Sequence, residues 1–133
     1  MTELRENRCR RHRAPEYVVR PAPDGGWRWW LRGQDAAVTA AGVTPTATSA
    51  AAASEVLHIR IIAAVGPTEV VADHHGSWRW RLLTRAGQVA AVSTIGFASH
   101  WAADRALDRF RLEASHAELV DEEPRLIRHP GRR

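Results

Sequence analysis

The chain has 133 residues, of which 19 are basic, 15 are acidic, seven are histidine and one is cysteine. That length suits one compact domain or two very small ones, and the 44% apolar content can build a core, which excludes wholesale disorder. No apolar run approaches the roughly 20 residues that span a bilayer, and a lone cysteine excludes an internal disulfide. We therefore expect a cytoplasmic protein without a membrane anchor.

Charge is concentrated at the start of the chain. Every basic residue is arginine, a composition typical of a GC-rich coding bias, and the formal net charge is only +4. Residues 1–15 show no hydrophobic period and are predicted to form a basic, flexible tail, and residues 118–133 a flexible C-terminal tail. Candidate phosphate-binding groups in the N-terminal tail are Arg8, Arg10, Arg11 and Arg13.

An internal repeat with a period of 51 residues is the strongest signal in the sequence. The segment GGWRWWL at 25–31 aligns with GSWRWRL at 76–82, and Arg60 aligns with Arg111. The pattern predicts two copies of one unit, repeat 1 at 16–66 and repeat 2 at 67–117, that together form one domain.

The first copy begins with two predicted strands. Residues 16–20 form a short β-branched run before a turn, and residues 27–32 alternate between two faces, which is the period of a half-buried strand. The apolar face of the second strand carries Trp27, Trp29 and Leu31, which we assign to the core. The opposite face carries Arg28, Trp30 and Arg32.

A third strand and a helix complete the first copy. We expect the strand near 37–41 and the helix from about 50 to 60, with Ala52, Val56 and Ile59 facing inward. The apolar piece 61–65 follows as a candidate fourth strand.

The second copy repeats this order. Its predicted strands are 69–72, 78–83 and about 88–93, and its helix runs from His100 to about Arg111 behind Ser99 as N-cap. In its second strand Trp78, Trp80 and Leu82 share the apolar face. The environment of Trp101, at the start of the helix, is left open.

A single unit of about 50 residues has too little core to be stable alone. Two units side by side can extend one sheet and cover one of its faces with both helices. We therefore expect an α+β fold in which two tandem β-β-β-α(-β) repeats form one pseudo-twofold antiparallel sheet, with two helices on one face.

Three segments of the second copy carry a family resemblance: WRWRL at 78–82, GQVAAVS at 87–93 and FAS at 97–99. With the alanine-rich helix that follows, they resemble the YegP-like repeat over about residues 17–116. That family of small bacterial and archaeal proteins has no characterised function. The resemblance implies two β-β-β-α-β units that share one sheet and exchange their last strands. The first copy departs from the pattern in two places. Residues 34–37 lack the turn glycine, and Thr46 stands at the position that the aromatic Phe97 has in the second copy.

No residue pattern supports catalysis or metal binding. His74 and His75 are adjacent in a turn and are expected to face solvent without binding metal. Cys9 lies in the basic tail without a positioned base, and Asp104 and Asp108 lie on the solvent face of a helix. We therefore expect no enzymatic activity and no cofactor.

The arginine-rich strand faces give the candidate binding surface. If the helices cover only one side of the sheet, the other side exposes Trp30 beside several guanidinium groups. The residues of this surface are Arg28, Trp30, Arg32, Arg79 and Arg81. Stacking aromatics and arginines are typical of a single-stranded nucleic-acid platform, but an ordinary solvated sheet face has the same composition. The sequence favours a small interaction protein that binds another protein or itself, with weak, sequence-tolerant nucleic-acid binding as the alternative.

Overall fold

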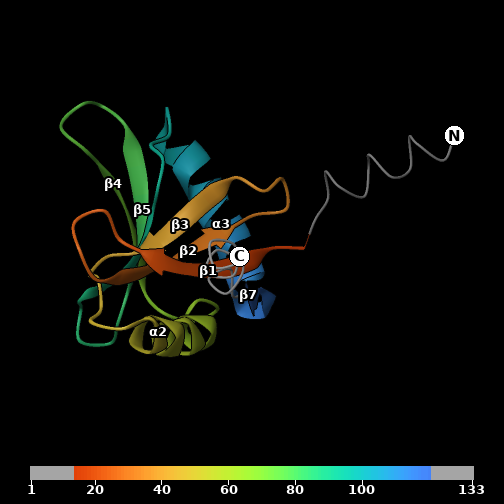
Figure 1. Ribbon diagram of the computed structural model, residues 1–133. Coiled ribbons are helices and arrows are strands. Elements are labelled where there is room, and N and C mark those ends of the chain that lie inside the picture. Colours follow the sequence, from red (N-terminus) through yellow and green to blue (C-terminus); the bar gives the residue numbers. More distant parts are fainter. Residues whose placement is uncertain (1–13, 121–133) are drawn as a thin grey trace, which may run out of the picture.

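The computed structural model describes residues 14–120, and the elements of the chain are arranged in two β-β-β-α units (Figure 1). The strands are β1 (Glu16–Pro21), β2 (Trp27–Arg32), β3 (Val38–Gly42), β4 (Thr68–Ala72), β5 (Trp78–Leu83), β6 (Val89–Ser93) and β7 (Glu118–Val120). The helices are α2 (Ser49–Ile62) and α3 (His100–His116). Within the described residues, neither helix is long and apolar enough to cross a membrane.

All seven strands belong to one sheet, in the order β4-β5-β6-β3-β2-β1-β7. The two repeats meet where β3 pairs antiparallel with β6. The sheet is mixed, not fully antiparallel as expected, because β7 pairs parallel with β1. Since β7 follows the helix of repeat 2 and pairs with the first strand of repeat 1, the expected strand exchange is present for repeat 2. Repeat 1 supplies no corresponding strand between α2 and β4. Residues 118–120 therefore form a strand, and the prediction that they belong to a flexible tail is wrong.

The core lies between one face of the sheet and the two helices, as expected. Its largest fully buried side chains include Trp29 in β2, Trp80 in β5 and Tyr17 in β1. Helix α2 packs on β1 and β2, and α3 packs on β4 and β5. The residues that the helices bury here are Ala52, Val56, Ile59, Ala103, Leu107, Phe110, Glu113 and Ala114. The apolar stripes predicted for both helices are confirmed.

Both helices start at the same point of their repeats. The side chain of Thr48 accepts a hydrogen bond from the backbone N–H of Ala51, and that of Ser99 accepts one from Ala102, each at 3.0 Å. The predicted N-cap Ser99 is confirmed. Both helices end later than expected, so that 61–65 completes α2 and a turn and does not form a fourth strand.

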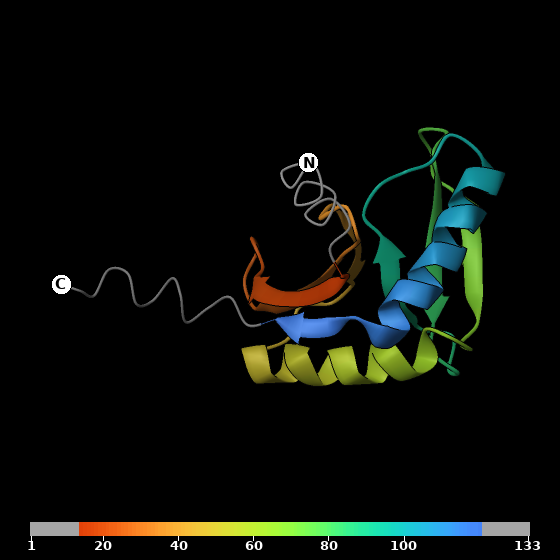
Figure 2. The same cartoon turned by 90° about the vertical axis from the view of Figure 1, so that its right-hand side faces the viewer.

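Two arginines at equivalent positions join the ends of the helices. Arg60 of α2 donates two hydrogen bonds to the carbonyl oxygen of Ala117, at 3.0 and 2.7 Å. Arg111 of α3 donates to the carbonyl oxygens of Ala63 at 3.0 Å and Gly66 at 3.1 Å. Figure 2 shows the C-terminal halves of α2 and α3 meeting beside the start of β7. Each arginine thus satisfies carbonyl groups at the end of the other helix, which the helix itself leaves without a partner.

The two departures of the first copy leave the architecture intact. Thr46 forms a bridge with Trp27, and Phe97 forms the equivalent bridge with Trp78. Ala36 has a φ of 71°, close to the 86° of Gly87 at the equivalent turn position. Because a side chain on Cβ disfavours this left-handed conformation, the turn before β3 carries a strain that the glycine of repeat 2 avoids.

Replacing Ala36→Gly should therefore stabilise the protein by about 0.5–1 kcal/mol, because the relief of strain exceeds the cost of the extra chain entropy of glycine. Urea unfolding followed by tryptophan fluorescence measures the difference. Ala86→Gly, in the equivalent turn but without a positive φ, is the matched control and should destabilise the protein slightly. Equal destabilisation by both substitutions would contradict the strain at Ala36.

Candidate interaction surfaces

The five residues of the predicted sheet surface lie in two separate groups. Arg28, Trp30 and Arg32 are on β2, whereas Arg79 and Arg81 are on β5, and β3 and β6 lie between these strands. At the usual strand spacing this separates the groups by roughly 14 Å. Their alternation with the buried residues of β2 and β5 places all five on the face away from the helices.

Three arginines of this surface are paired with carboxylates. Arg32 contacts Glu16 at 3.2 Å, and Arg81 contacts Glu69 at 3.4 Å, both across neighbouring strands. Arg79 contacts Asp73 at 3.5 Å. These side chains are partly exposed, so the ion pairs add little to stability, but they neutralise much of the positive charge of the surface.

The fourth arginine has a backbone partner. The Arg28 guanidinium donates to the carbonyl oxygen of Val43 at 3.3 Å, and its Nε is buried without a hydrogen-bond partner within the described chain. One nitrogen of this guanidinium already donates to Val43 and another is buried, so the group is poorly placed to donate hydrogen bonds to a phosphate.

Trp30 is half-buried and does not stand free on the sheet. In the strand register it lies opposite Val18 of β1 and Ala41 of β3, which are 0% and 4% exposed. The row continues with Val92 of β6 and then Arg81 of β5. Trp30 is therefore part of an apolar strip across the middle of the sheet.

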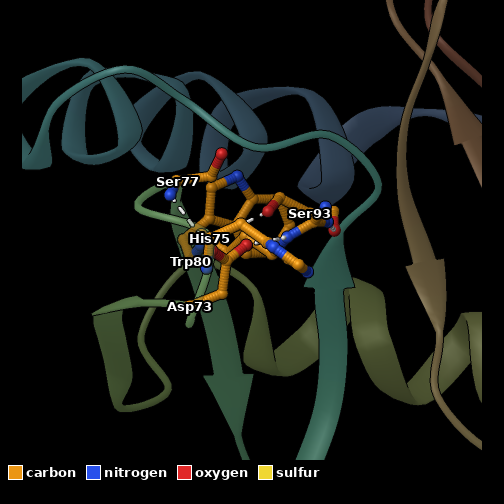
Figure 3. A network of polar contacts seen from close by, with 6 residues as sticks. Asp73, His75, Ser77, Trp80 and Ser93 are labelled. Atoms are coloured by element: carbon orange, nitrogen blue, oxygen red, sulfur yellow. Dashed lines mark hydrogen bonds and ion pairs between the residues drawn. The ribbon is translucent and has the colours of Figure 1, made fainter.

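The turn between β4 and β5 holds the carboxylate that binds Arg79 (Figure 3). Asp73 accepts hydrogen bonds from the backbone N–H groups of His75, at 2.8 Å, and Ser77, at 3.0 Å. These two bonds hold the pKa of Asp73 below its ordinary value, and the hydrogen bond from Arg79 adds to the effect. The imidazole rings of His74 and His75 lie 4.3 Å apart, and within residues 14–120 no group of three His, Cys, Asp or Glu side chains is placed to hold a metal ion.

A groove of about 660 Å³ runs along α3, and the sequence did not predict it. One wall is the outer side of the helix, where Trp101 is 67% exposed and Leu112 is 68% exposed. The facing residues come from the loop before α3, Ile95 and Phe97, and from the start of β3, Val38. The groove therefore combines elements of both repeats.

Charged side chains of both signs line the same groove. The guanidinium carbon of Arg105 lies 5.0 Å from the centre of the Trp101 ring, a cation–π distance that orients both side chains. The other charged residues of the lining are Asp35, Asp108, Arg109 and Glu113. A lining of this kind suits an apolar group flanked by mixed charges better than a polyanion.

Glu113 connects α3 to the turn between β2 and β3. It is only 6% exposed, and its carboxylate lies so close to Gly33 that a Cβ there would be 3.3 Å from Oε1. Burial raises the pKa of Glu113, whereas the hydrogen bond from the backbone N–H of Gln34 and the charge of Arg109 lower it, and Asp35 adds to the rise. The carboxylate holds the turn at the base of the groove.

The sequence signal for the groove is a difference between the two repeats at equivalent helix positions. Where repeat 2 has Trp101 and Arg105, repeat 1 has Ala50 and Ser54. A large exposed aromatic that appears in only one copy is not required by the shared fold, which is the one sequence signal that points here. The predicted basic run Arg8–Arg13 lies outside the described residues.

Comparisons with known proteins find the same fold in proteins of unknown function. No protein family model and no curated protein matches the chain. The NMR structure of yegP from E. coli, a protein of unknown function, superposes with a TM-score of 0.71 at 12% identity over 82% of this chain and 93% of that one. The UPF0339 protein SO3888 from Shewanella oneidensis gives a TM-score of 0.70 at 11% identity, over 91% and 100%. At this identity the likeness shows the fold, and the resemblance to YegP-like proteins is confirmed at that level.

The raised pKa of Glu113 makes stability depend on pH. Since the folded state holds this proton more tightly than the unfolded state, the contribution of Glu113 to stability is greatest at low pH and falls as pH rises above the ordinary pKa of 4.5. Relative to Glu113→Gln, which cannot ionise, the wild-type protein should therefore gain stability as the pH falls from neutral to 4.5. Thermal unfolding of both proteins across this range measures the difference. A difference that does not change with pH would contradict the burial of an ionisable Glu113.

Proposed function

We propose that the protein is a non-enzymatic interaction module of the cytoplasm that binds a segment of another protein in the groove beside α3. The observation that carries this proposal is the gathering of exposed apolar side chains along one groove. The side chains of Ile95, Trp101 and Leu112 are each at least half exposed, and all three line the same groove of about 660 Å³. Apolar side chains that face solvent together around a concave surface are typical of binding sites.

The chemistry of the groove supports a peptide-like occupant. Its floor includes Trp80 and Phe110, whose rings pack 4.4 Å apart in the core, so the site is built on rigid elements. Trp101 with the stacked Arg105 resembles the aromatic and arginine anchors that dominate protein interfaces. A partner segment would place one large apolar side chain against Trp101 and a second one against Leu112, which lies roughly 16 Å further along α3.

A catalytic role finds little support in the same residues. The most deeply buried carboxylate of the groove belongs to Glu113. It accepts a hydrogen bond from the backbone N–H of Gln34, so its role is to hold the turn between β2 and β3 in place. An acid or base catalyst must instead reach the reacting atoms of a substrate.

The nucleic-acid alternative rests on the sheet surface. Its weakness is electrostatic, since Arg32, Arg79 and Arg81 each face a carboxylate. Nucleic-acid affinity depends on the number of phosphates that free cations neutralise. Few such cations remain on this face, so it supports the alternative less than the groove supports a protein partner.

Selection of displayed random peptides on the full chain tests the proposal. We expect enriched peptides with a large apolar anchor, whose dissociation constants rise at least about ten-fold on Trp101→Ala, because the anchor loses its main contact. Trp30→Ala is the matched control, another tryptophan outside the groove, and should leave peptide affinity unchanged. Fluorescence anisotropy of the labelled peptides gives both values.

Single-stranded RNA and DNA serve as the competing ligands in the same assay. Nucleic-acid binding that weakens steeply between about 50 and 200 mM salt and is lost on Trp30→Ala would replace the proposal by its alternative. The absence of any enriched peptide that depends on Trp101 would also overturn it.

A further inference from the structure

The outer side of α2 is apolar and lacks permanent charge. Leu57 is 55% exposed, Ile61 is 70% exposed, and Val65, just beyond the helix, is 82% exposed. The two permanently charged residues of this helix are only partly exposed, because Glu55 lies towards Trp29 and Arg60 is bound to Ala117. In Figure 2, α2 lies at the margin of the described residues, so that one side of the helix faces away from the sheet.

Exposed residues of α2 and of the turn after it follow the spacing of a coiled-coil seam. Alternating intervals of four and three residues connect Ala50, Ser54, Leu57, Ile61 and Ala64, and all five are exposed. Seams of this spacing lie along one narrow stripe of a helix and pack against a second helix. The buried face of α2 uses other positions, Val56 and Ile59 among them, so within residues 14–120 the seam takes no part in the core.

Side-chain size is graded along the part of the seam that lies within α2. The N-terminal half has the small residues Ala50 and Ser54, and the C-terminal half has the large residues Leu57 and Ile61. If two such helices pack antiparallel, Ala50 faces Ile61 of the other helix and Ser54 faces Leu57. Each layer then pairs a small side chain with a large one, which is how helices achieve close contact.

We propose that the protein forms a homodimer in which the α2 helices of two copies pack antiparallel along this seam. A second copy supplies a partner that is equally apolar and uncharged, and the gradation of size fits the seam to itself. The twofold arrangement is isologous, so each residue pair occurs twice. In such a dimer the Ser54 hydroxyl can donate a hydrogen bond to a carbonyl oxygen of its own helix, as serine in helices does. This dimer is separate from partner binding in the α3 groove.

The dimer is expected to be weak and reversible. A 14-residue helix is about 21 Å long, and a single helix pair buries less than the roughly 1,600 Å² of a standard interface. Sedimentation equilibrium of the full chain from about 10 µM to 1 mM therefore covers the expected dissociation constant.

The substitution Leu57→Asp tests which surface forms the dimer. It should raise the dissociation constant at least about ten-fold, because two carboxylates would be buried in the seam, while the exposed position keeps the fold intact. Trp101→Ala, on the other helix, is the control and should leave the dimer unchanged. A wild-type protein that stays monomeric up to about 1 mM, or a dimer that depends on Trp101 and not on Leu57, would overturn the proposal.

A pair of charges tests the antiparallel register. Ile61→Glu alone should weaken the dimer, and adding Ala50→Arg should restore it, since each new guanidinium would face a new carboxylate of the other copy. In a parallel pair the same double substitution would place like charges together and weaken the dimer further. Failure of the double variant to recover would contradict the antiparallel arrangement, and circular dichroism confirms that each variant is folded.

Discussion

Two arginines, one on each helix, bind backbone carbonyl groups at the end of the other helix. The arrangement of the repeats depends on these reciprocal hydrogen bonds. Arg60 binds Ala117, at the point where the chain leaves α3 for β7. Arg111 binds Ala63 and Gly66, where the chain leaves α2 for β4. A helix leaves its last carbonyl groups unpaired and carries partial negative charge there, so a guanidinium from outside satisfies both needs. The buried hydroxyl of Tyr17 adds a 2.6 Å hydrogen bond to the carbonyl oxygen of Ala114.

Because the structural framework is shared, the two helices are free to differ on their outer sides. At equivalent positions α3 has Trp101 and Arg105, beside a groove, whereas α2 has Ala50 and Ser54, in an uncharged seam. The inner residues of both helices serve the same core. The duplicated unit therefore presents two unlike surfaces, which fits a protein that meets two kinds of partner, another protein and a second copy of itself.

The sequence predicted those parts of the fold that follow a short-range pattern. The bounds of β2 and β5 were predicted from the alternation of inward Trp, Trp and Leu with outward-facing side chains, and the cap at Ser99 from its local chemistry. Residues 61–62 read as a strand because isoleucine is β-branched, yet they continue α2 beside the bound Arg60. Strand β7 and the groove depend on how the two repeats come together, and no local pattern contains either: β7 pairs with β1 of the other repeat, and the groove is lined by α3 and by Val38 of the other repeat. The sequence placed the candidate arginines on one face but did not reveal their carboxylate partners, which come from neighbouring strands and a turn.

Native-state hydrogen exchange of the Arg111→Met variant tests the central claim, that the reciprocal arginines make the two repeats one cooperative unit. The amide protons of β2, in repeat 1, and of β5, in repeat 2, should lose protection by the same free energy, about 2–4 kcal/mol for the lost hydrogen bonds. Arg85→Met, at an exposed turn position, should change neither strand. Loss of protection in β5 alone, with β2 unchanged, would show that the repeats unfold separately and would contradict the claim.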